Sequence, residues 1–180
     1  VLQALIGAMA IEAGERGVTV SVASDTLLVG HLTDVEDVAA VLGNLVGNAV
    51  AAAVRGGDPG RVEIGCYGDG TTLVLTVADS GPGLTIDNPF LGGEESAREG
   101  DAVHGWGIGL RLSRELAQRR GGDVWVIDRG GRPCAEADRE DGEEHEVQRR
   151  EDVRQQVHDG GQLHHGVVGR LVGEEDDDEE

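Results

Sequence analysis

The sequence contains no lysine: all 15 basic residues among its 180 are arginine, against 35 acidic residues. This absence excludes enzymes that need an essential lysine at the phosphates, such as P-loop NTPases and Ser/Thr/Tyr protein kinases. The formal charge of −20 argues against nucleic acid or an anionic membrane surface as a partner, because both would repel the chain. Only 2% of the residues are aromatic, so the core must be built from small aliphatic side chains.

Cysteines and long apolar runs are also scarce. Cys66 and Cys134 are too few for a disulfide framework, which is typical of a reducing cytoplasm. No apolar run in the sequence approaches the ~20 residues needed to cross a bilayer. The chain begins at Val1 with neither an initiator methionine nor a signal peptide, so we expect a cytoplasmic fragment of a longer protein.

The composition changes near Gly130 and Gly131, which divides the chain in two. Residues 1–131 carry regular apolar patterns and are expected to form one domain. The remaining 49 residues, 132–180, contain only eight Val and Leu and end in seven consecutive acids. So little apolar surface cannot offset the entropy of ordering, so we expect an acidic, largely disordered tail.

Apolar periodicity within residues 1–131 predicts alternating helices and strands. The longest helix follows a capping box at Thr33–Glu36 and carries apolar residues at steps of three and four as far as Ala53. Other helices are predicted to start at Leu2 and to span 108–120, and strands are predicted at 18–22, 61–67, 72–78 and 123–127, the middle two as an antiparallel hairpin. This order indicates an α+β fold, a two-layer α/β sandwich with helices on one face of a mixed sheet.

The long helix has an unusual polar face. Asn44 and Asn48 lie four residues apart and therefore share one face, away from the apolar stripe. Both are poor helix formers, and Gly43 and Gly47 beside them each cost about 1 kcal/mol relative to alanine. A close-packed or solvated polar face is one explanation. The other is that the glycines admit a ligand while the amide oxygens coordinate a hard cation such as Mg²⁺.

Two further motifs combine a strand or helix end with glycines. Residues 79–83, Asp-Ser-Gly-Pro-Gly, follow a predicted strand, where a carboxylate can accept a hydrogen bond from an exocyclic amine. Residues 105–110, Gly-Trp-Gly-Ile-Gly-Leu, lead into a helix, and amides at a helix start bind phosphate oxygens. The spacing and the missing strand before this motif exclude a Rossmann site.

In this order and at these separations, the three motifs resemble the ATP-binding domain of sensor histidine kinases, in the GHKL ATPase superfamily. Residues 42–49 look like the N box, 79–83 like the G1 box and 105–110 like the G2 box. Residues 88–90, Asn-Pro-Phe, fall where the family has its F box, and 120–124 match its helix end, Gly-Gly and strand. The resemblance covers about residues 1–130 and is nearest to citrate/dicarboxylate-type sensors.

The resemblance implies a site for ATP and Mg²⁺. Asn48 would coordinate Mg²⁺ at the phosphates with Asn44 beside it, and Asp79 would bind the adenine amine. The implied ATP-binding residues are Asn44, Asn48, Asp79, Gly81, Gly83, Gly105, Gly107, Gly109 and Leu110. Few catalytic side chains are expected, because phosphoryl transfer relies on positioning and charge neutralisation.

The implied function is transfer of the γ-phosphoryl group from Mg·ATP to a histidine on a separate dimerisation domain, in a two-component pair with a response regulator. None of the six histidines in this chain lies in such a helical context, and the parent protein is expected to be anchored upstream, with no membrane contact by this fragment. The family's last apolar strand is also expected to be missing after residue 131, which leaves a non-catalytic nucleotide-binding module as an alternative. An anti-sigma-factor serine kinase is a third possibility, but Asn44 stands where such proteins usually have glutamate.

Overall fold

The computed structural model describes residues 2–24, 26–28, 34–57, 59–68, 72–83, 90, 108–127 and 165–172. Within these residues, six strands form one mixed sheet. They are β1 (Val18–Val22), β2 (Leu27–Leu28), β3 (Gly60–Gly68), β4 (Thr72–Asp79), β5 (Asp123–Ile127) and β6 (His165–Val172). The strand order is β1-β3-β4-β6-β5, with β2 also pairing with β3. β1 and β2 run parallel to β3, and the other neighbours are antiparallel.

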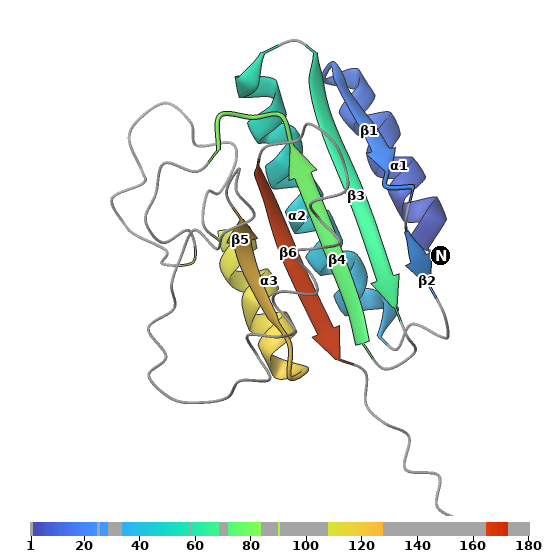
Figure 1. The fold of residues 1–180 in the computed structure, drawn as a ribbon, viewed down its shortest axis with the longest axis vertical. Helices are drawn as coiled ribbons and strands as arrows, with labels where there is room; N and C mark the ends of the chain where they lie inside the picture. The colour runs from blue at the N-terminus through green and yellow to red at the C-terminus, as the bar shows by residue number, and fades with distance from the viewer. Residues whose placement is uncertain are drawn as a thin grey trace, which may run out of the picture.

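Three helices cover one face of this sheet and lie behind it in Figure 1. They are α1 (Leu2–Glu15), α2 (Val35–Gly56) and α3 (Ile108–Arg119). α2 packs against β3 and β4 in the middle of the sheet, α3 packs against β5 and β6, and α1 packs against β1. The expected α+β sandwich with helices on one face is therefore confirmed, and so is the β3–β4 hairpin.

Alternation along the strands explains why one face of the sheet is the core. In β4, the buried residues Leu73, Leu75 and Val77 alternate with half-buried ones, as a pleated strand requires. Cys66 of β3 belongs to the same core, and burial raises the pKa of its thiol to about 11. The opposing stripe of α2 consists of Val38, Val41, Leu42, Leu45, Val46, Ala49, Val50 and Ala53. Each fully buried Val or Leu side chain in this stripe contributes roughly 1.5–3 kcal/mol.

Strand β6 corrects the expectation that the last strand of the fold is missing. β6 lies between β4 and β5, with its Cα register running from Thr72 opposite Val172 to Asp79 opposite His165. Leu171 is buried in the core, and Gly169 lies against the side chains of Val41 and Leu45 of α2. The segment 165–172 is thus part of the domain rather than of a tail. The rest of 132–180 lies outside the described residues.

The start of α2 also differs from the prediction. Asp34 holds the N-cap position in a left-handed conformation, with φ 57° and ψ 59°, and its side chain makes no capping hydrogen bond. Thr33 of the predicted capping box lies outside the described residues. The Asp34 carboxylate instead forms an ion pair with Arg120, just after α3. Arg120 Nε also donates a hydrogen bond to Asp37 Oδ2 at 3.0 Å. The acids at the start of α2 therefore hold the two helices together.

By length and composition, α2 is the one helix among the described residues that could cross a membrane. No segment of this kind was predicted from the sequence. Its apolar stripe lies against β3 and β4, as in the core helix of a folded domain.

Candidate functional site

The polar face of α2 carries both predicted asparagines. Asn44 and Asn48 are half-buried, beside the fully buried stripe of the same helix. Ala52 continues this face one turn further on. Each four-residue step along a helix is about 6 Å, so the three residues form a line roughly 12 Å long. The other two motifs meet this line at its two ends.

At the Ala52 end, Asp79 closes β4 and begins the Asp-Ser-Gly-Pro-Gly turn. Its side chain is only 8% exposed, and Gly81 donates its backbone N–H to Asp79 Oδ1 at 2.8 Å. Burial raises the pKa of Asp79 to about 6, while the Gly81 hydrogen bond and the charge of Arg55 act in the opposite direction. Asp79 is therefore a buried carboxylate that is mostly ionised at neutral pH.

The turn after Asp79 approaches α2 so closely that only glycine fits. A Cβ at Gly81 would lie 2.7 Å from the carbonyl carbon and oxygen of Ala52 and 2.7 Å from Asp79 Oδ1. A Cβ at Gly56 would lie 2.6 Å from the Ser80 carbonyl oxygen. Gly83 has φ 84°, a backbone conformation that favours glycine. Glycine at positions 56 and 81 therefore lets the turn that follows Asp79 lie directly against the helix.

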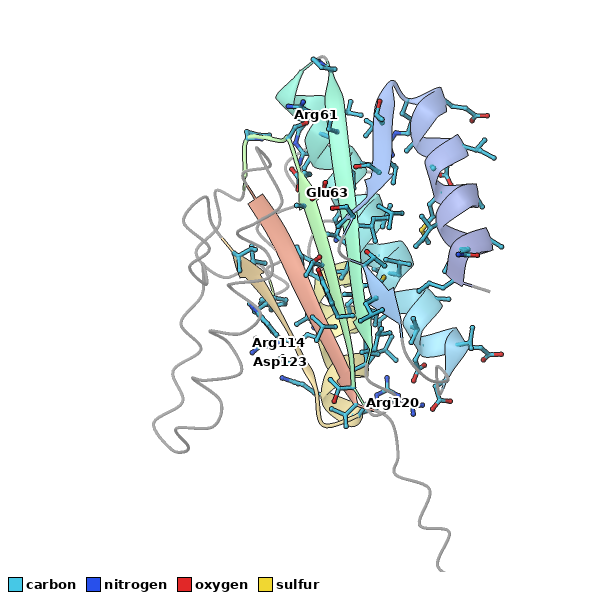
Figure 2. All side chains as sticks on the ribbon, turned by 45° about the vertical axis from the view of Figure 1, so that its right-hand side comes forward. Arg61, Glu63, Arg114, Arg120 and Asp123 are labelled. Atoms are coloured by element: carbon cyan, nitrogen blue, oxygen red, sulfur yellow. The ribbon has the colours of Figure 1, made fainter. Side chains whose placement is uncertain are left out.

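Ser80 fixes this turn to the neighbouring strand. The backbone N–H of Arg61 in β3 donates to Ser80 Oγ at 2.9 Å, and the Ser80 N–H donates to the Arg61 carbonyl at 3.0 Å. These two hydrogen bonds attach Ser80, the residue between Asp79 and Gly81, to β3. In Figure 2, Arg61 lies at one end of the sheet and Arg120 at the other.

At the Asn44 end, the first turn of α3 meets α2. A Cβ built on Gly109 would lie 3.6 Å from Asn44 Cγ and from Asn44 Oδ1, so a methyl group at this position would be in van der Waals contact with Asn44. Asn44 Nδ2 also donates to Ser113 Oγ at 3.2 Å. Leu110, the next predicted site residue, is 6% exposed and belongs to the core. Gly105 and Gly107 lie outside the described residues.

The structure thus brings together Asn44, Asn48, Asp79, Gly81 and Gly109, which lie far apart in the sequence. One face of α2 contacts the Asp79–Gly81 turn at Ala52 and the start of α3 at Asn44, with Asn48 between them. The site therefore offers a buried carboxylate at one end and amide side chains beside a helix start at the other. Helix starts carry partial positive charge and free N–H groups suited to anions.

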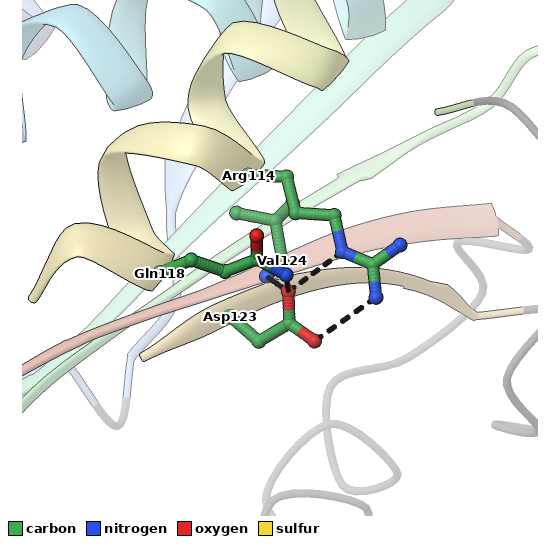
Figure 3. Close-up of polar contacts among 4 residues, drawn as sticks. All are labelled: Arg114, Gln118, Asp123 and Val124. Atoms are coloured by element: carbon green, nitrogen blue, oxygen red, sulfur yellow. Dashed lines mark hydrogen bonds and ion pairs between the residues drawn. The ribbon is translucent and has the colours of Figure 1, made fainter. Parts of the chain in front are cut away.

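One polar cluster, between α3 and β5, was not predicted from the sequence. Arg114 of α3 pairs with Asp123 of β5 through two hydrogen bonds, Nε to Oδ1 at 2.8 Å and Nη2 to Oδ2 at 3.2 Å (Figure 3). The Asp123 carboxylate also accepts from Gln118 Nε2 and from the Val124 N–H. The guanidinium carbon of Arg114 lies 4.7 Å from the centre of the Phe90 ring. The only sign of this cluster in the sequence was an acid, Asp123, directly after the Gly-Gly pair, with an arginine, Arg114, in the helix before that pair.

No group of three or more His, Cys, Asp or Glu side chains gathers in the part of the chain that the structure describes. A metal held there would need oxygen ligands from other sources, and the amide oxygens of Asn44 and Asn48 are of that kind. Hard cations such as Mg²⁺ take few protein ligands and keep substrate phosphates and water as the others. The donor set at the Asn48 position fits that chemistry.

A family model described as "Histidine kinase-, DNA gyrase B-, and HSP90-like ATPase" matches residues 33–159, more than half of the chain. The chain belongs to this family. It is 32% identical over 130 residues to the aerobic respiration control sensor protein ArcB of Escherichia coli, covering 68% of this chain and 16% of ArcB. It is 34% identical over 95 residues to the adaptive-response sensory kinase SasA of Thermosynechococcus vestitus, covering 51% of this chain and 24% of SasA.

These relatives are sensor proteins and sensory kinases of several kinds. The C4-dicarboxylate transport sensor protein DctB of Rhizobium meliloti is 33% identical over 92 residues, covering 48% of this chain and 13% of DctB. Its similarity does not stand out from that of ArcB or SasA. The chain spans less than a quarter of the length of each of these three proteins.

Solved structures share the fold. Full-length ShkA in complex with AMPPNP aligns with a TM-score of 0.55 at 22% identity, covering 96% of this chain and 30% of ShkA. The catalytic domain of the histidine kinase ThkA aligns with a TM-score of 0.53 at 18% identity, covering 95% of this chain and 93% of that domain. These structures show the shared fold, and the family match together with the sensor relatives shows that the chain is an ATP-binding domain of the kind found in sensor histidine kinases.

Proposed function

We propose that this chain binds Mg·ATP along the polar face of α2 and donates the γ-phosphoryl group to a histidine on a separate dimerisation domain. The observation that carries the proposal is the double contact of α2, with the Asp79–Gly81 turn at Ala52 and with the start of α3 at Asn44. A nucleotide lying along this face would have a hydrogen-bond acceptor at one end and helix-start amides at the other.

Asp79 would hold the adenine end. Gly81 already donates to its Oδ1, so the second carboxylate oxygen, Oδ2, is the acceptor available to the exocyclic amine of adenine. The low exposure of Asp79 makes such a hydrogen bond selective, because a base without a donor would leave a buried charge unpartnered. The close approach of Gly81 and the turn at Gly83 would shape the space beside the ring.

Asn48 would hold Mg²⁺ at the phosphates, with Asn44 beside it. A chain with a net charge of −20 and no lysine repels a free triphosphate. When bound, Mg²⁺ would supply the charge that neutralises the phosphates. Asn48 contributes a neutral oxygen ligand and adds no further negative charge. Gly105, Gly107, Gly109 and Leu110 would form the helix start that faces the phosphates.

The partners follow from the transfer reaction. A histidine nitrogen would attack the γ-phosphorus, forming a P–N bond while the bond to ADP breaks. The histidine would come from the dimerisation domain of the parent protein, and a response regulator would receive the phosphoryl group. We place the domain in the cytoplasm, with any membrane anchor upstream of it.

The first test is nucleotide binding by the full chain, measured by calorimetry with Mg·ATP. We expect binding by wild type and loss of binding in Asn48→Ala and Asp79→Ala, with both variants folded, because neither residue belongs to the apolar stripe. Glu36→Ala provides a matched control, since Glu36 is exposed in the first turn of the same helix. Unchanged affinity in either site variant would contradict the site assignment.

The second test separates kinase activity from the alternatives. Incubation with labelled ATP and a supplied dimerisation domain should give an acid-labile, base-stable phosphohistidine. Acid-stable phosphoserine on a supplied protein substrate would instead favour a serine kinase, and binding without transfer would favour a non-catalytic module. One reason for the non-catalytic alternative, the expected loss of the last strand, no longer holds because β6 occupies that place in the sheet.

A further inference from the structure

Ser113 of α3 is one of two buried polar or charged residues in the described part of the chain, Asp79 being the other. Its side chain is fully buried, with 0% exposure, and none of the predicted motifs includes it. A buried hydroxyl is costly unless its hydrogen bonds are made. The two contacts that Ser113 makes both involve residues of the proposed nucleotide site.

The hydroxyl of Ser113 connects α2 with the first turn of α3. Ser113 Oγ donates to the Gly109 carbonyl at 2.8 Å and accepts from Asn44 Nδ2 at 3.2 Å. A serine hydroxyl has a single proton, and Gly109 receives it. Toward Asn44, the hydroxyl can therefore only accept. This restriction makes the NH₂ group of Asn44, and not its oxygen, the partner of Ser113.

The orientation of the Asn44 amide follows from this restriction. With Nδ2 held by Ser113, Oδ1 cannot occupy the same position, and it lies 3.6 Å from a Cβ built on Gly109. Rotation of the amide by half a turn would bring two acceptor oxygens together, which is unfavourable. The hydrogen bond therefore selects one of the two orientations of an amide side chain on the polar face of α2.

We infer that Ser113 is a positioning residue, which fixes the amide of Asn44 for binding of Mg·ATP and joins the two helices that form the phosphate end of the site. This inference rests on the proposed function. Ser113 itself touches no ligand in this account and acts through Asn44. Its bond to Gly109 also ties the hydroxyl to the helix start that faces the phosphates.

The test is a double-mutant cycle on Mg·ATP affinity with Ser113→Ala, Asn44→Ala and the double variant. Loss of one hydrogen bond of this kind corresponds to a weakening of about 2- to 12-fold in Ser113→Ala. In the Asn44→Ala background, Ser113→Ala should weaken binding no further, because the residue through which it acts is gone. An equal additional loss in that background would overturn the inference.

Leu116→Ala is the control for loosening of α3. Leu116 lies three residues after Ser113, is partly buried and packs against the core, without a contact to Asn44 among those described. It should lower the free energy of unfolding while leaving Mg·ATP affinity within about twofold of wild type. An equal weakening of affinity by Leu116→Ala and Ser113→Ala would show a general structural role and would overturn the proposal.

A measurement on the wild-type chain needs no destabilised variant. The sequence has only three asparagines, so the side-chain NH₂ signal of Asn44 can be identified by NMR from its absence in Asn44→Ala. Its protons should exchange with water more slowly than those of Asn48. Exchange at the same rate for both would overturn the inference even if Ser113→Ala fails to fold. If the wild-type chain bound no Mg·ATP while the Asn44 NH₂ protons still exchanged slowly, only the proposed function would be contradicted.

Discussion

Asp79→Asn is expected to stabilise the folded domain while weakening nucleotide binding. Burial raises the pKa of Asp79 to about 6 from a usual 3.8, so the folded state holds this proton more tightly than the unfolded chain does. Between pH 4 and 6 the unfolded chain binds fewer protons, and the free energy of unfolding falls as pH rises. A shift of this size corresponds to about 3 kcal/mol of lost stability at pH 7.

The amide of asparagine has the same shape and no charge to bury, and its Oδ1 can still accept from the Gly81 N–H. We therefore expect Asp79→Asn to raise the free energy of unfolding by about 1–3 kcal/mol at pH 7. The gain should be smaller by about 1 kcal/mol at pH 5, where the wild-type carboxyl is already protonated in the folded state. Urea unfolding of both proteins from pH 5 to 7.5 measures this difference, and the other acids cancel because both chains share them.

Nucleotide affinity should change in the opposite direction. Replacing a charged acceptor by a neutral one is expected to weaken Mg·ATP binding at least about tenfold. Glu63→Gln is the matched control, because it makes the same change on β3, at a position opposite Ala78 and on the other face of the sheet from Asp79. Equal stability of wild type and Asp79→Asn at both pH values would refute the burial argument, and unchanged affinity would refute the assignment of Asp79.

The remaining predictions concern the last strand, two glycines and one ion pair. Gly169→Ala should stabilise the domain by about 1–2 kcal/mol, because a Cβ there would lie 3.6 Å from two core methyl groups. Gly169→Asp should instead destabilise the domain by several kcal/mol, because it buries a charge. Unchanged midpoints of urea unfolding in both variants would place residue 169 outside the core. Gly109→Ala should leave the fold intact and weaken Mg·ATP binding, since its Cβ would contact Asn44. Gly81→Ala should lower the melting temperature, because its Cβ would clash with Ala52. Calorimetry that shows unfolding at lower temperature in Gly109→Ala but not in Gly81→Ala would contradict this geometry. Arg114→Ala should cost about 1–3 kcal/mol in urea unfolding, because it removes a paired, partly buried partner of Asp123, and a variant as stable as wild type would show that this cluster does not hold α3 to β5.

Most of the fold could be predicted from the sequence because its elements have strong local patterns. The apolar stripe of α2 has regular helical spacing, and β3 and β4 alternate and are separated by a short Gly-rich turn. These patterns predicted the helices, the hairpin and the helix-covered sheet. The start of α2 was less predictable. The predicted capping box relied on Thr33 and Glu36, whereas the structure has Asp34 at the N-cap position, and Asp34 and Asp37 bind Arg120, more than 80 residues later in the chain.

Strand β6 was missed because its signal is short and lies within a long acidic segment. Averaged over residues 132–180, apolar residues are too sparse to form a core, yet four of the eight Val and Leu fall within 165–172. Gly169 made the pattern weaker still, although the absence of a side chain there suits a strand that lies directly against Val41 and Leu45. Composition averaged over a long window cannot detect a strand that neighbouring elements stabilise.

The candidate site could be proposed from its residue types, but its connections gave no signal in the sequence. Poor helix formers in α2 and glycines after a strand indicate a ligand, because they otherwise destabilise the elements that contain them. The bridge from Asn44 through Ser113 to Gly109 depends on two helices meeting, and serine in a helix carries no sequence signal for such a contact. For the same reason Arg114 and Asp123 were not recognised as a pair.

The position of β6 has a consequence for synthesis of the protein. Among the described strands, β5 has β6 as its one neighbour, so this edge of the sheet cannot close until residues 165–172 have left the ribosome. Synthesis proceeds at roughly 5–20 residues per second, so α2 and the β3–β4 hairpin have time to form before the last strand arrives. The nascent chain would carry every proposed nucleotide-binding residue well before the strand that joins β5 to β4 is available.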